Sequence, residues 1–207
     1  MSGSTIRMAR DCEHLLAEAQ THCADDLSAM LAAVAHVEGL LLDWQLAWLY
    51  ALAQPYDGAP ILEIGTYRGK SALVMAMACP RSAVITLTIH SKEAAEAACA
   101  VAGRQVDIRV VKSWDYLAGY SGPDLGMVYV DGDHNQVIRD LGWFNWLIVG
   151  GLLLLHDWSP VGSPPVQACY RAIGEFSRTL GRPPDVQIVD TRQVGMAGFY
   201  RGEGETA

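Results

Sequence analysis

The segment at residues 61–71 constrains the fold of this chain more than any other part of its sequence. It reads Ile-Leu-Glu-Ile-Gly-Thr-Tyr-Arg-Gly-Lys-Ser, and small and apolar residues continue to position 78. An apolar run, two glycines and a helical pattern predict a strand, a tight turn and a helix. Gly65 permits backbone conformations that other residues disfavour and lets a ligand approach closely. Because a helix start presents unpaired N–H groups, the turn is a candidate cofactor site.

The spacing of the glycines separates the kinds of cofactor that this turn could bind. A dinucleotide turn needs Gly-x-Gly-x-x-Gly, but Thr66 and Tyr67 follow Gly65. A P-loop needs four residues between its first glycine and Gly-Lys-Ser, and only three separate Gly65 from Gly69. The remaining pattern, acid-x-Gly-x-x-x-Gly, is typical of an S-adenosylmethionine turn, with Glu63 near the ammonium group of the ligand. A structural turn without a ligand is the alternative.

The composition describes a chain that can bury a sizeable core. Hydrophobic residues make up 51% of the 207 residues and charged residues 18%, which argues against global disorder. The net charge is −8 and no long basic run occurs, so we expect neither nucleic acid nor a membrane as a partner. The five cysteines are scattered, which is typical of reduced thiols, and we expect a cytoplasmic protein.

A helical pattern at the start of the chain gives way to alternating strands and helices. We expect an N-terminal helical extension over residues 1–54, with helices from residue 5 onward, and one α/β domain over residues 55–207. The expected strands are 60–64, 83–89, 106–111, 125–131, 151–156, 185–190 and 194–200. The expected helices of the domain are 69–78, 92–102, 134–149 and 166–180.

This alternation predicts a Rossmann-like, doubly wound, seven-stranded sheet that is mostly parallel. The last two strands are joined by a short connection, so we expect them to form an antiparallel hairpin. Two other segments end an apolar strand in ionisable residues: 126–134 reads Gly-Met-Val-Tyr-Val-Asp-Gly-Asp-His, and 150–158 reads Gly-Gly-Leu-Leu-Leu-Leu-His-Asp-Trp. Their carboxyl ends should lie at the same sheet edge as the Gly65 turn.

With these three segments the chain resembles the class I S-adenosylmethionine-dependent methyltransferases. It is most similar to the small-molecule group that includes macrocin-type sugar O-methyltransferases and cephalosporin hydroxylase-like proteins, over about residues 38–200. The resemblance implies methyl transfer from S-adenosylmethionine to a hydroxyl of a small molecule, such as a sugar, a polyketide or another natural product. We also expect a homo-oligomer, and the N-terminal helices are candidates for a lid or a dimer surface.

The resemblance also implies which residues form the site. The residues expected to contact the cofactor are Glu63, Gly65, Thr66, Tyr67, Gly69, Ser71, His90, Ser113, Trp114 and Asp131. In related metal-dependent enzymes, acids at two strand ends bind Mg²⁺, which implies Asp131 and Asp157 as ligands, with His134 and His156 beside them. His134 is the candidate general base, and Asp131 is the second candidate catalytic residue. Structural roles as helix caps or packing groups are the alternative for these residues.

Three positions depart from the pattern of the family. The second strand of the domain ends in His90 and Ser91, where an acid commonly binds the ribose hydroxyls. Lys112 stands where an acid often precedes Ser113, and Trp158 stands where a metal ligand is frequent. These departures support a second hypothesis, a catalytically inactive methyltransferase-like binding or assembly module. A different enzyme on the same scaffold is a third.

Overall fold

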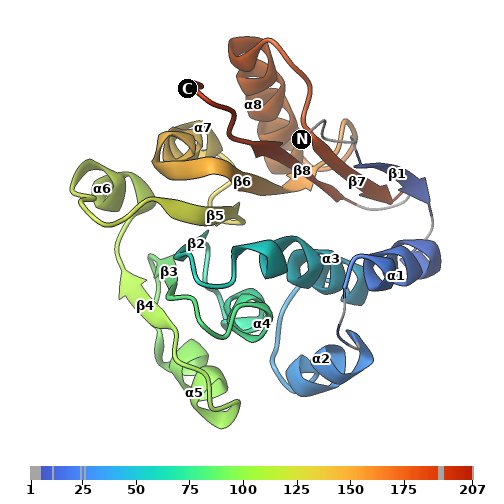
Figure 1. Cartoon of the computed structure of the whole chain (residues 1–207), viewed down its shortest axis with the longest axis vertical. Helices are drawn as coiled ribbons and strands as arrows, with labels where there is room; N and C mark the ends of the chain where they lie inside the picture. Colours follow the sequence, from blue (N-terminus) through green and yellow to red (C-terminus); the bar gives the residue numbers. More distant parts are fainter. Residues whose placement is uncertain (1–5, 11, 24, 26, 191–193, 207) are drawn as a thin grey trace.

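The structure of the chain is a computed structural model that describes residues 6–10, 12–23, 25, 27–190 and 194–206. Its centre is an eight-stranded sheet with the order β1-β7-β8-β6-β5-β2-β3-β4 (Figure 1). The strands are β1 (Ile6–Arg10), β2 (Ile61–Ile64), β3 (Val84–Thr88), β4 (Asp107–Val110), β5 (Leu125–Val130), β6 (Leu147–Trp158), β7 (Val186–Asp190) and β8 (Gly195–Tyr200). β8 is antiparallel to β6 and β7, and the other pairs are parallel. The predicted α/β class, the seven predicted strands and the hairpin are confirmed.

β1 is a strand that lies within the predicted helical extension. It pairs in parallel with β7, so that Ile6 lies opposite Val186 and Arg10 opposite Asp190. A partner so far away in the sequence leaves no local signal, whereas the apolar residues that follow residue 8 recur at helical spacing. The prediction of helices from residue 5 onward is therefore wrong for residues 6–10, and the sheet has an eighth strand.

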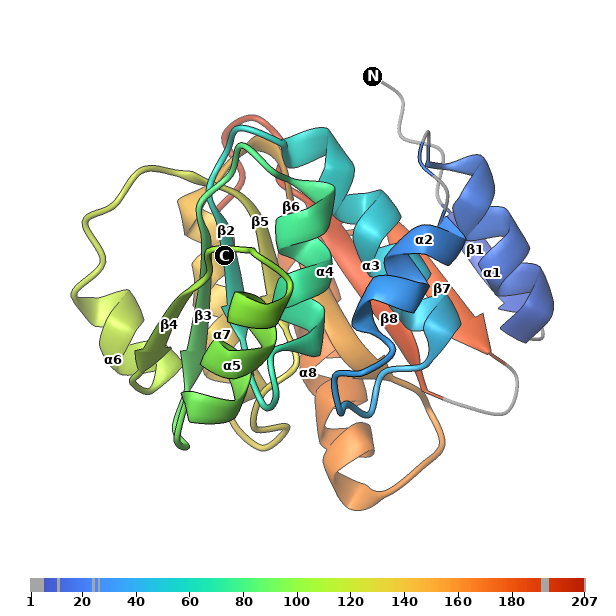
Figure 2. The same ribbon diagram turned by 90° about the horizontal axis from the view of Figure 1, so that it is seen from below.

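Helices cover both faces of the sheet (Figures 1 and 2). They are α1 (Cys12–Thr21), α2 (Leu27–Val34), α3 (Asp43–Ala53), α4 (Lys70–Ala78), α5 (Glu93–Val101), α6 (Ser113–Ala118), α7 (Val137–Asp140) and α8 (Pro164–Leu180), with 3₁₀ helices η1 (Gln54–Tyr56) and η2 (Leu141–Trp146). Buried residues of α1–α4 share a core with Met127 and Tyr129 of β5. Val128 and Val130 point into a second core with α7, η2 and α8. Successive residues of a strand face opposite sides, so the two cores lie on the two faces of the sheet.

α3 joins the N-terminal helices to the sheet. Trp44 and Trp48 of this helix are at most 2% exposed and belong to the same core as β2, β5 and β6. The helices that precede the domain therefore pack directly against it. The boundary predicted at residue 54 stays a prediction.

The predicted helix over residues 134–149 is wrong in length. α7 and η2 together end at Trp146, and β6 begins at Leu147, which pairs with Leu125 of β5. The pairing register shifts before Met127, and Gly150 within β6 has a φ of +80°. The apolar residues at the end of the predicted helix are compatible with a buried strand as well as with a helix, and the pairing with β5 decides for the strand. The short helix α6 was not predicted.

The register of the sheet determines which residues meet at its carboxyl edge. Val130 of β5 pairs with Ile64 of β2 on one side and with Leu155 of β6 on the other. The residues that follow these three positions, 65, 131 and 156, therefore stand side by side.

Among the described ranges, no helix has the length and apolar character needed to cross a bilayer.

Candidate functional site

Gly65 packs against the backbone of the neighbouring strand. Its φ is +108°, and a Cβ atom here would lie 2.1 Å from the carbonyl oxygen of Asp131. The N–H groups of Gly65 and Thr66 both donate to the carbonyl of Leu87, at 3.0 and 3.2 Å. Gly69, with a φ of +83°, precedes the first residue of α4. Glycine at position 65 therefore fixes the turn against β5 and leaves its backbone open for a ligand.

Glu63 is fully buried behind this turn. Its carboxylate accepts a hydrogen bond from the hydroxyl of Thr86, which lies 2.7 Å from the hydroxyl of Thr66. Burial raises the pKa of Glu63 to about 8, although hydrogen bonds from Ser71 and Thr86 act in the opposite direction. The structure thus places this predicted cofactor residue where it links β2 to β3 beneath the turn.

A cavity of about 750 Å³, here termed the tryptophan cavity, opens at the ends of β2, β3, β4 and β5. The predicted residues that line it are Gly65, Thr66, Tyr67, His90, Ser113, Trp114 and Asp131. The guanidinium of Arg139 lies 5.0 Å from the centroid of the Trp114 ring, and the ammonium of Lys112 lies 5.6 Å from it. Both distances are in the range of cation–π contacts, which hold the ring at the cavity wall.

Asp140 also lines the tryptophan cavity, although it was not among the predicted site residues. It accepts a hydrogen bond from the hydroxyl of Ser113, and burial raises its pKa to about 6. The hydroxyl of Ser113 is therefore engaged with protein. An acid three residues after buried Val137, on the apolar side of a helix, is the signal that would have found Asp140.

A second cavity of about 640 Å³, here termed the histidine cavity, lies on the other side of the turn. It shares Gly65, Thr66, Tyr67 and Asp131 with the tryptophan cavity. Its other lining residues come from the loop before α3, from α3, from the turn before α4, from α4, from the ends of β5 and β6 and from the residue that precedes β8: Gly39, Leu40, Leu41, Leu42, Gln45, Arg68, Lys70, Ser71, His134, His156, Asp157 and Val194. The two cavities therefore meet at the turn and at Asp131.

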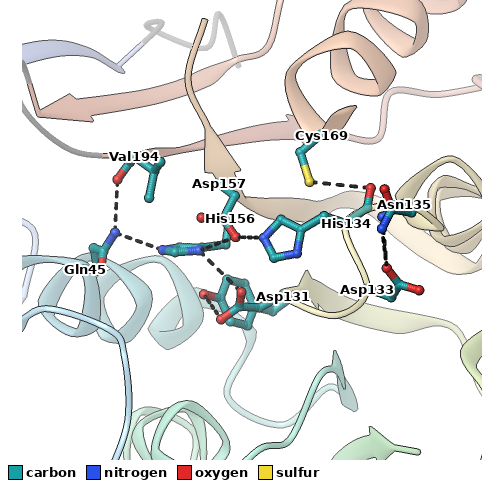
Figure 3. A network of polar contacts seen from close by, with 10 residues as sticks. Gln45, Asp131, Asp133, His134, Asn135, His156, Asp157, Cys169 and Val194 are labelled. Carbon is teal, nitrogen blue, oxygen red and sulfur yellow. Dashed lines mark hydrogen bonds and ion pairs between the residues drawn. The ribbon is translucent and has the colours of Figure 1, made fainter. Parts of the chain in front are cut away.

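Four ionisable side chains form an acid–histidine cluster in the histidine cavity: Asp131, His134, His156 and Asp157 (Figure 3). Nε2 of His134 contacts Oδ2 of Asp157. Nδ1 of His156 lies 3.2 Å from the same oxygen and 3.3 Å from Oδ1 of Asp131. Asp157 has a φ of +58°, which is unusual for a residue with a side chain. Such backbone strain is concentrated at functional sites.

The charges of this cluster compensate one another. The hydrogen bond to Asp157 raises the pKa of His134 above its ordinary value, against the effect of burial. Burial would lower the pKa of His156, but the carboxylates of Asp131 and Asp157 outweigh it and raise this pKa above its ordinary value, while the amide nitrogen of Gln45 beside Nε2 opposes a second proton. Burial would raise the pKa of Asp157, but the hydrogen bond with His134 and the nearby Nδ1 of His156 hold it below its usual range.

Gln45 reaches the cluster from α3, although it was not among the predicted site residues. Its Nε2 lies 2.8 Å from Nε2 of His156 and donates to the carbonyl of Val194 at 3.1 Å. Its Oε1 accepts a hydrogen bond from the N–H of Leu42 at 2.9 Å. Gln45 is only 2% exposed. A polar residue within the apolar run of α3 is the only local signal for it, because buried amides need partners.

The predicted metal ligands meet the distance requirement of a metal site but not its chemistry. Donor atoms of Asp131, His156 and Asp157 lie within 4.8 Å of one another. Mg²⁺ prefers oxygen ligands, and a metal-binding imidazole nitrogen must carry no proton. Nδ1 of His156 instead faces two carboxylates, while its Nε2 faces the amide donor of Gln45. Trp158 offers no ligand. The described residues therefore do not fit Mg²⁺.

The structure brings most of the predicted site residues to the two cavities. Ser71 lines the histidine cavity, and the other cofactor residues line the tryptophan cavity, except for two. Glu63 lies behind the turn, and Gly69 packs against α5, where a Cβ atom would lie 3.0 Å from that of Ala95. The predicted acids and histidines come together as one cluster.

Known proteins share this chain's sequence pattern and fold. Residues 62–158 match a family model described as a methyltransferase domain. A protein of Mycobacterium tuberculosis described as a probable O-methyltransferase is 28% identical over 183 residues, which cover 80% of this chain and 78% of that protein. The O-methyltransferase TomG of Streptomyces achromogenes, involved in tomaymycin synthesis and solved with S-adenosylmethionine, superimposes with a TM-score of 0.63 at 20% identity, covering 92% of this chain and 96% of that one. An O-methyltransferase of Bacillus cereus, solved with S-adenosylhomocysteine, gives a TM-score of 0.63 at 18% identity, covering 92% and 100%.

Residues 62–158 match the methyltransferase domain family, and the chain as a whole has the class I methyltransferase fold. The matched residues contain both the Gly65 turn and the acid–histidine cluster. The predicted family, the class I S-adenosylmethionine-dependent methyltransferases, is thereby confirmed, and with it the predicted enzyme class. The solved structures are less than 25% identical to this chain, so their similarity supports a shared fold and not a shared activity.

Proposed function

We propose that this chain transfers the methyl group of S-adenosylmethionine to a hydroxyl oxygen of a small molecule. The observation that carries the proposal is the pair of cavities that meet at Gly65 and Asp131. One cavity would hold the cofactor and the other the acceptor, so that the methyl group passes at their junction. Methyl transfer depends mainly on alignment of the acceptor oxygen and removal of its proton.

We assign the adenosyl part of the cofactor to the tryptophan cavity. Trp114 offers an aromatic face there, and His90 offers an imidazole for the ribose hydroxyls in place of the usual acid. The turn from Gly65 to Tyr67 would bind the sulfonium and amino-acid portion, with Ser71 on the histidine side. The cofactor complexes of the two solved neighbours support this choice of ligand.

His134 is the proposed general base. Its Nε2 contacts Asp157, which leaves Nδ1 as the nitrogen with a free lone pair. In the transfer, the acceptor oxygen forms a bond to the methyl carbon and the carbon–sulfur bond breaks, releasing S-adenosylhomocysteine. The proton of the acceptor hydroxyl passes to Nδ1 of His134. Asp157 stabilises the resulting imidazolium, and Asp131 orients the cofactor or the acceptor at the junction.

Mg²⁺ was predicted from the resemblance but is not part of this proposal. The donor set of the cluster does not fit a cation that prefers oxygen ligands. The proton transfer above therefore relies on the His134–Asp157 pair.

We propose a natural-product hydroxyl, on a sugar, a polyketide or a similar scaffold, as the acceptor. Leu40, Leu41 and Leu42 line the histidine cavity and would suit a partly apolar molecule. The role of TomG in tomaymycin synthesis supports the same class.

A homo-oligomer and a cytoplasmic location are retained as proposals, and sedimentation of the purified protein tests the first.

Calorimetric titration with S-adenosylmethionine and S-adenosylhomocysteine tests the cofactor. We expect saturable binding of both, and no binding at millimolar ligand would contradict the proposal. Incubation with isotopically labelled S-adenosylmethionine and a panel of hydroxylated natural products then tests the transfer by mass spectrometry.

The residues after β3 favour a second candidate, an inactive binding or assembly module. His90 and Ser91 stand there instead of an acid, which removes a charge-assisted bond to the ribose. Cofactor binding without methyl transfer to any acceptor of the panel, and without slow hydrolysis of the cofactor, would favour this candidate.

A further inference from the structure

We infer that the imidazole of His156, oriented by Gln45, takes the place between Asp131 and Asp157 that a divalent cation would otherwise occupy. Gln45 is thus a positioning residue for the acid–histidine cluster. The inference rests on the proposed methyl transfer for its catalytic meaning, but cation binding and the state of His156 can be measured without turnover.

The first step is the position of the ring. The side chain of His156 is only 10% exposed, and its Nδ1 lies 3.3 Å from Asp131 and 3.2 Å from Asp157. It therefore stands within reach of one oxygen of each carboxylate. Like charges in a buried site repel strongly, so the position between these two carboxylates favours an N–H group or a cation.

The second step is the orientation of the Gln45 amide. Two backbone groups fix it: the N–H of Leu42 donates to its Oε1, and the carbonyl of Val194 accepts from its Nε2. Gln45 stands at the third position of α3, and the first of these bonds satisfies an N–H group at the helix start. Turning the amide by 180° would place its nitrogen against the N–H of Leu42 and its oxygen against the carbonyl of Val194, and neither pair can form a hydrogen bond. The buried amide therefore presents its nitrogen to His156.

The third step is the position of the imidazole proton. Because Nε2 of His156 lies 2.8 Å from an amide donor, Nε2 is the acceptor of that pair. The proton of a neutral ring must then be on Nδ1, which faces the carboxylates. A ring carrying two protons also keeps one on Nδ1. In both states the nitrogen that faces Asp131 and Asp157 has no lone pair for a cation.

Manganese binding tests the inference directly. We expect the wild-type protein to leave the electron paramagnetic resonance spectrum of Mn²⁺ in its free form. His156→Glu should bind Mn²⁺ at least about tenfold more tightly, because it adds an oxygen ligand and still accepts the Gln45 hydrogen bond. His36→Glu, on an exposed histidine outside both cavities, is the matched control and should behave as wild type.

Mn²⁺ binding by the wild-type protein that is lost in Asp157→Asn would overturn the inference. Titration of the same samples with S-adenosylmethionine keeps the two proposals apart. Failure of cofactor binding would contradict the proposed function and leave the manganese result unchanged.

Nitrogen NMR of histidine-labelled protein gives a second readout, with the His156 signals identified by their loss in His156→Gln. In the wild type we expect a proton on Nδ1. In Gln45→Glu the carboxylate would accept from Nε2, so we expect a proton to appear there, whereas a purely structural role for Gln45 would leave the state of Nε2 unchanged. A wild-type Nδ1 without a proton would refute the inference, even if the variants do not fold.

Discussion

The Gly65 turn and the acid–histidine cluster lie side by side at one sheet edge, yet they are specified in different ways. The turn comes from one run of sequence, and its key residue is fixed by a φ of +108° and by contact with the backbone of Asp131. The cluster is assembled from the ends of β5 and β6 and depends on Gln45 of α3.

This difference has a physical reason. A turn is a backbone conformation, and glycine spacing reports it locally. The protonation and hydrogen bonding of a buried histidine depend on every group around it, and those groups come from distant segments. The sequence at the ends of β5 and β6 therefore predicted which ionisable residues meet, but not their protonation or their hydrogen bonds.

The largest expected effect is on the turn. Gly65→Ala would force a Cβ atom to 2.1 Å from the carbonyl of Asp131, so we expect loss of the folded domain or of all cofactor binding. Gly58→Ala is the matched control, because Gly58 has the same φ of +108° with nothing within 4 Å of a Cβ atom. Thermal denaturation should show a small loss for Gly58→Ala, on the order of 1 kcal/mol. Equal losses for both variants would mean that the contact with Asp131 is unimportant.

The next effect is on the cluster. His134→Ala removes the proposed base, and we expect kcat to fall by roughly 10²–10⁴ while cofactor affinity stays nearly unchanged. His36→Ala is the control. Because Asp157 raises the pKa of His134, the wild-type kcat should rise with pH and reach its plateau above the ordinary histidine pKa. Asp157→Asn should move this rise to lower pH. A kcat in His134→Ala within twofold of wild type would exclude the base role.

A third prediction concerns the acid behind the turn. Burial raises the folded-state pKa of Glu63 from 4.5 to about 8, so the folded protein holds a proton that the unfolded chain releases between these values. Stability from this group is therefore present at low pH and lost as the pH rises toward 8. Glu63→Gln should be more stable than wild type at pH 9, by on the order of 2–4 kcal/mol, and similar at pH 4. Urea denaturation measures both, and Glu13→Gln, on an exposed residue, is the control.

The smallest expected effect is at the far wall of the tryptophan cavity. Trp114→Ala should weaken S-adenosylmethionine binding by about tenfold, since stacking of an aromatic side chain on a base contributes about 1–3 kcal/mol. Trp114→Phe should recover most of this affinity. Calorimetry measures both, and unchanged affinity in Trp114→Ala would show that the adenine lies elsewhere.

Most of the fold could be predicted from the sequence. The seven strands of the α/β domain have strong local apolar patterns, and the short connection between the last two predicted the hairpin. β1 could not be predicted, because its pairing with Val186–Asp190 is nonlocal. The start of β6 at Leu147 was assigned to a helix because a short apolar run fits both structures.

The sequence by itself determined the class of the protein and the place of its site. The glycine spacing after Glu63 and the acids that end two strands are local features, and they led to the methyltransferase family. Only the tertiary structure decided how these residues act. It buried Glu63 behind the turn, paired Ser113 with Asp140 and set Gln45 against His156. The reason is that burial and hydrogen bonding depend on neighbours from distant segments, and the register of the sheet and the packing of α3 bring those neighbours together.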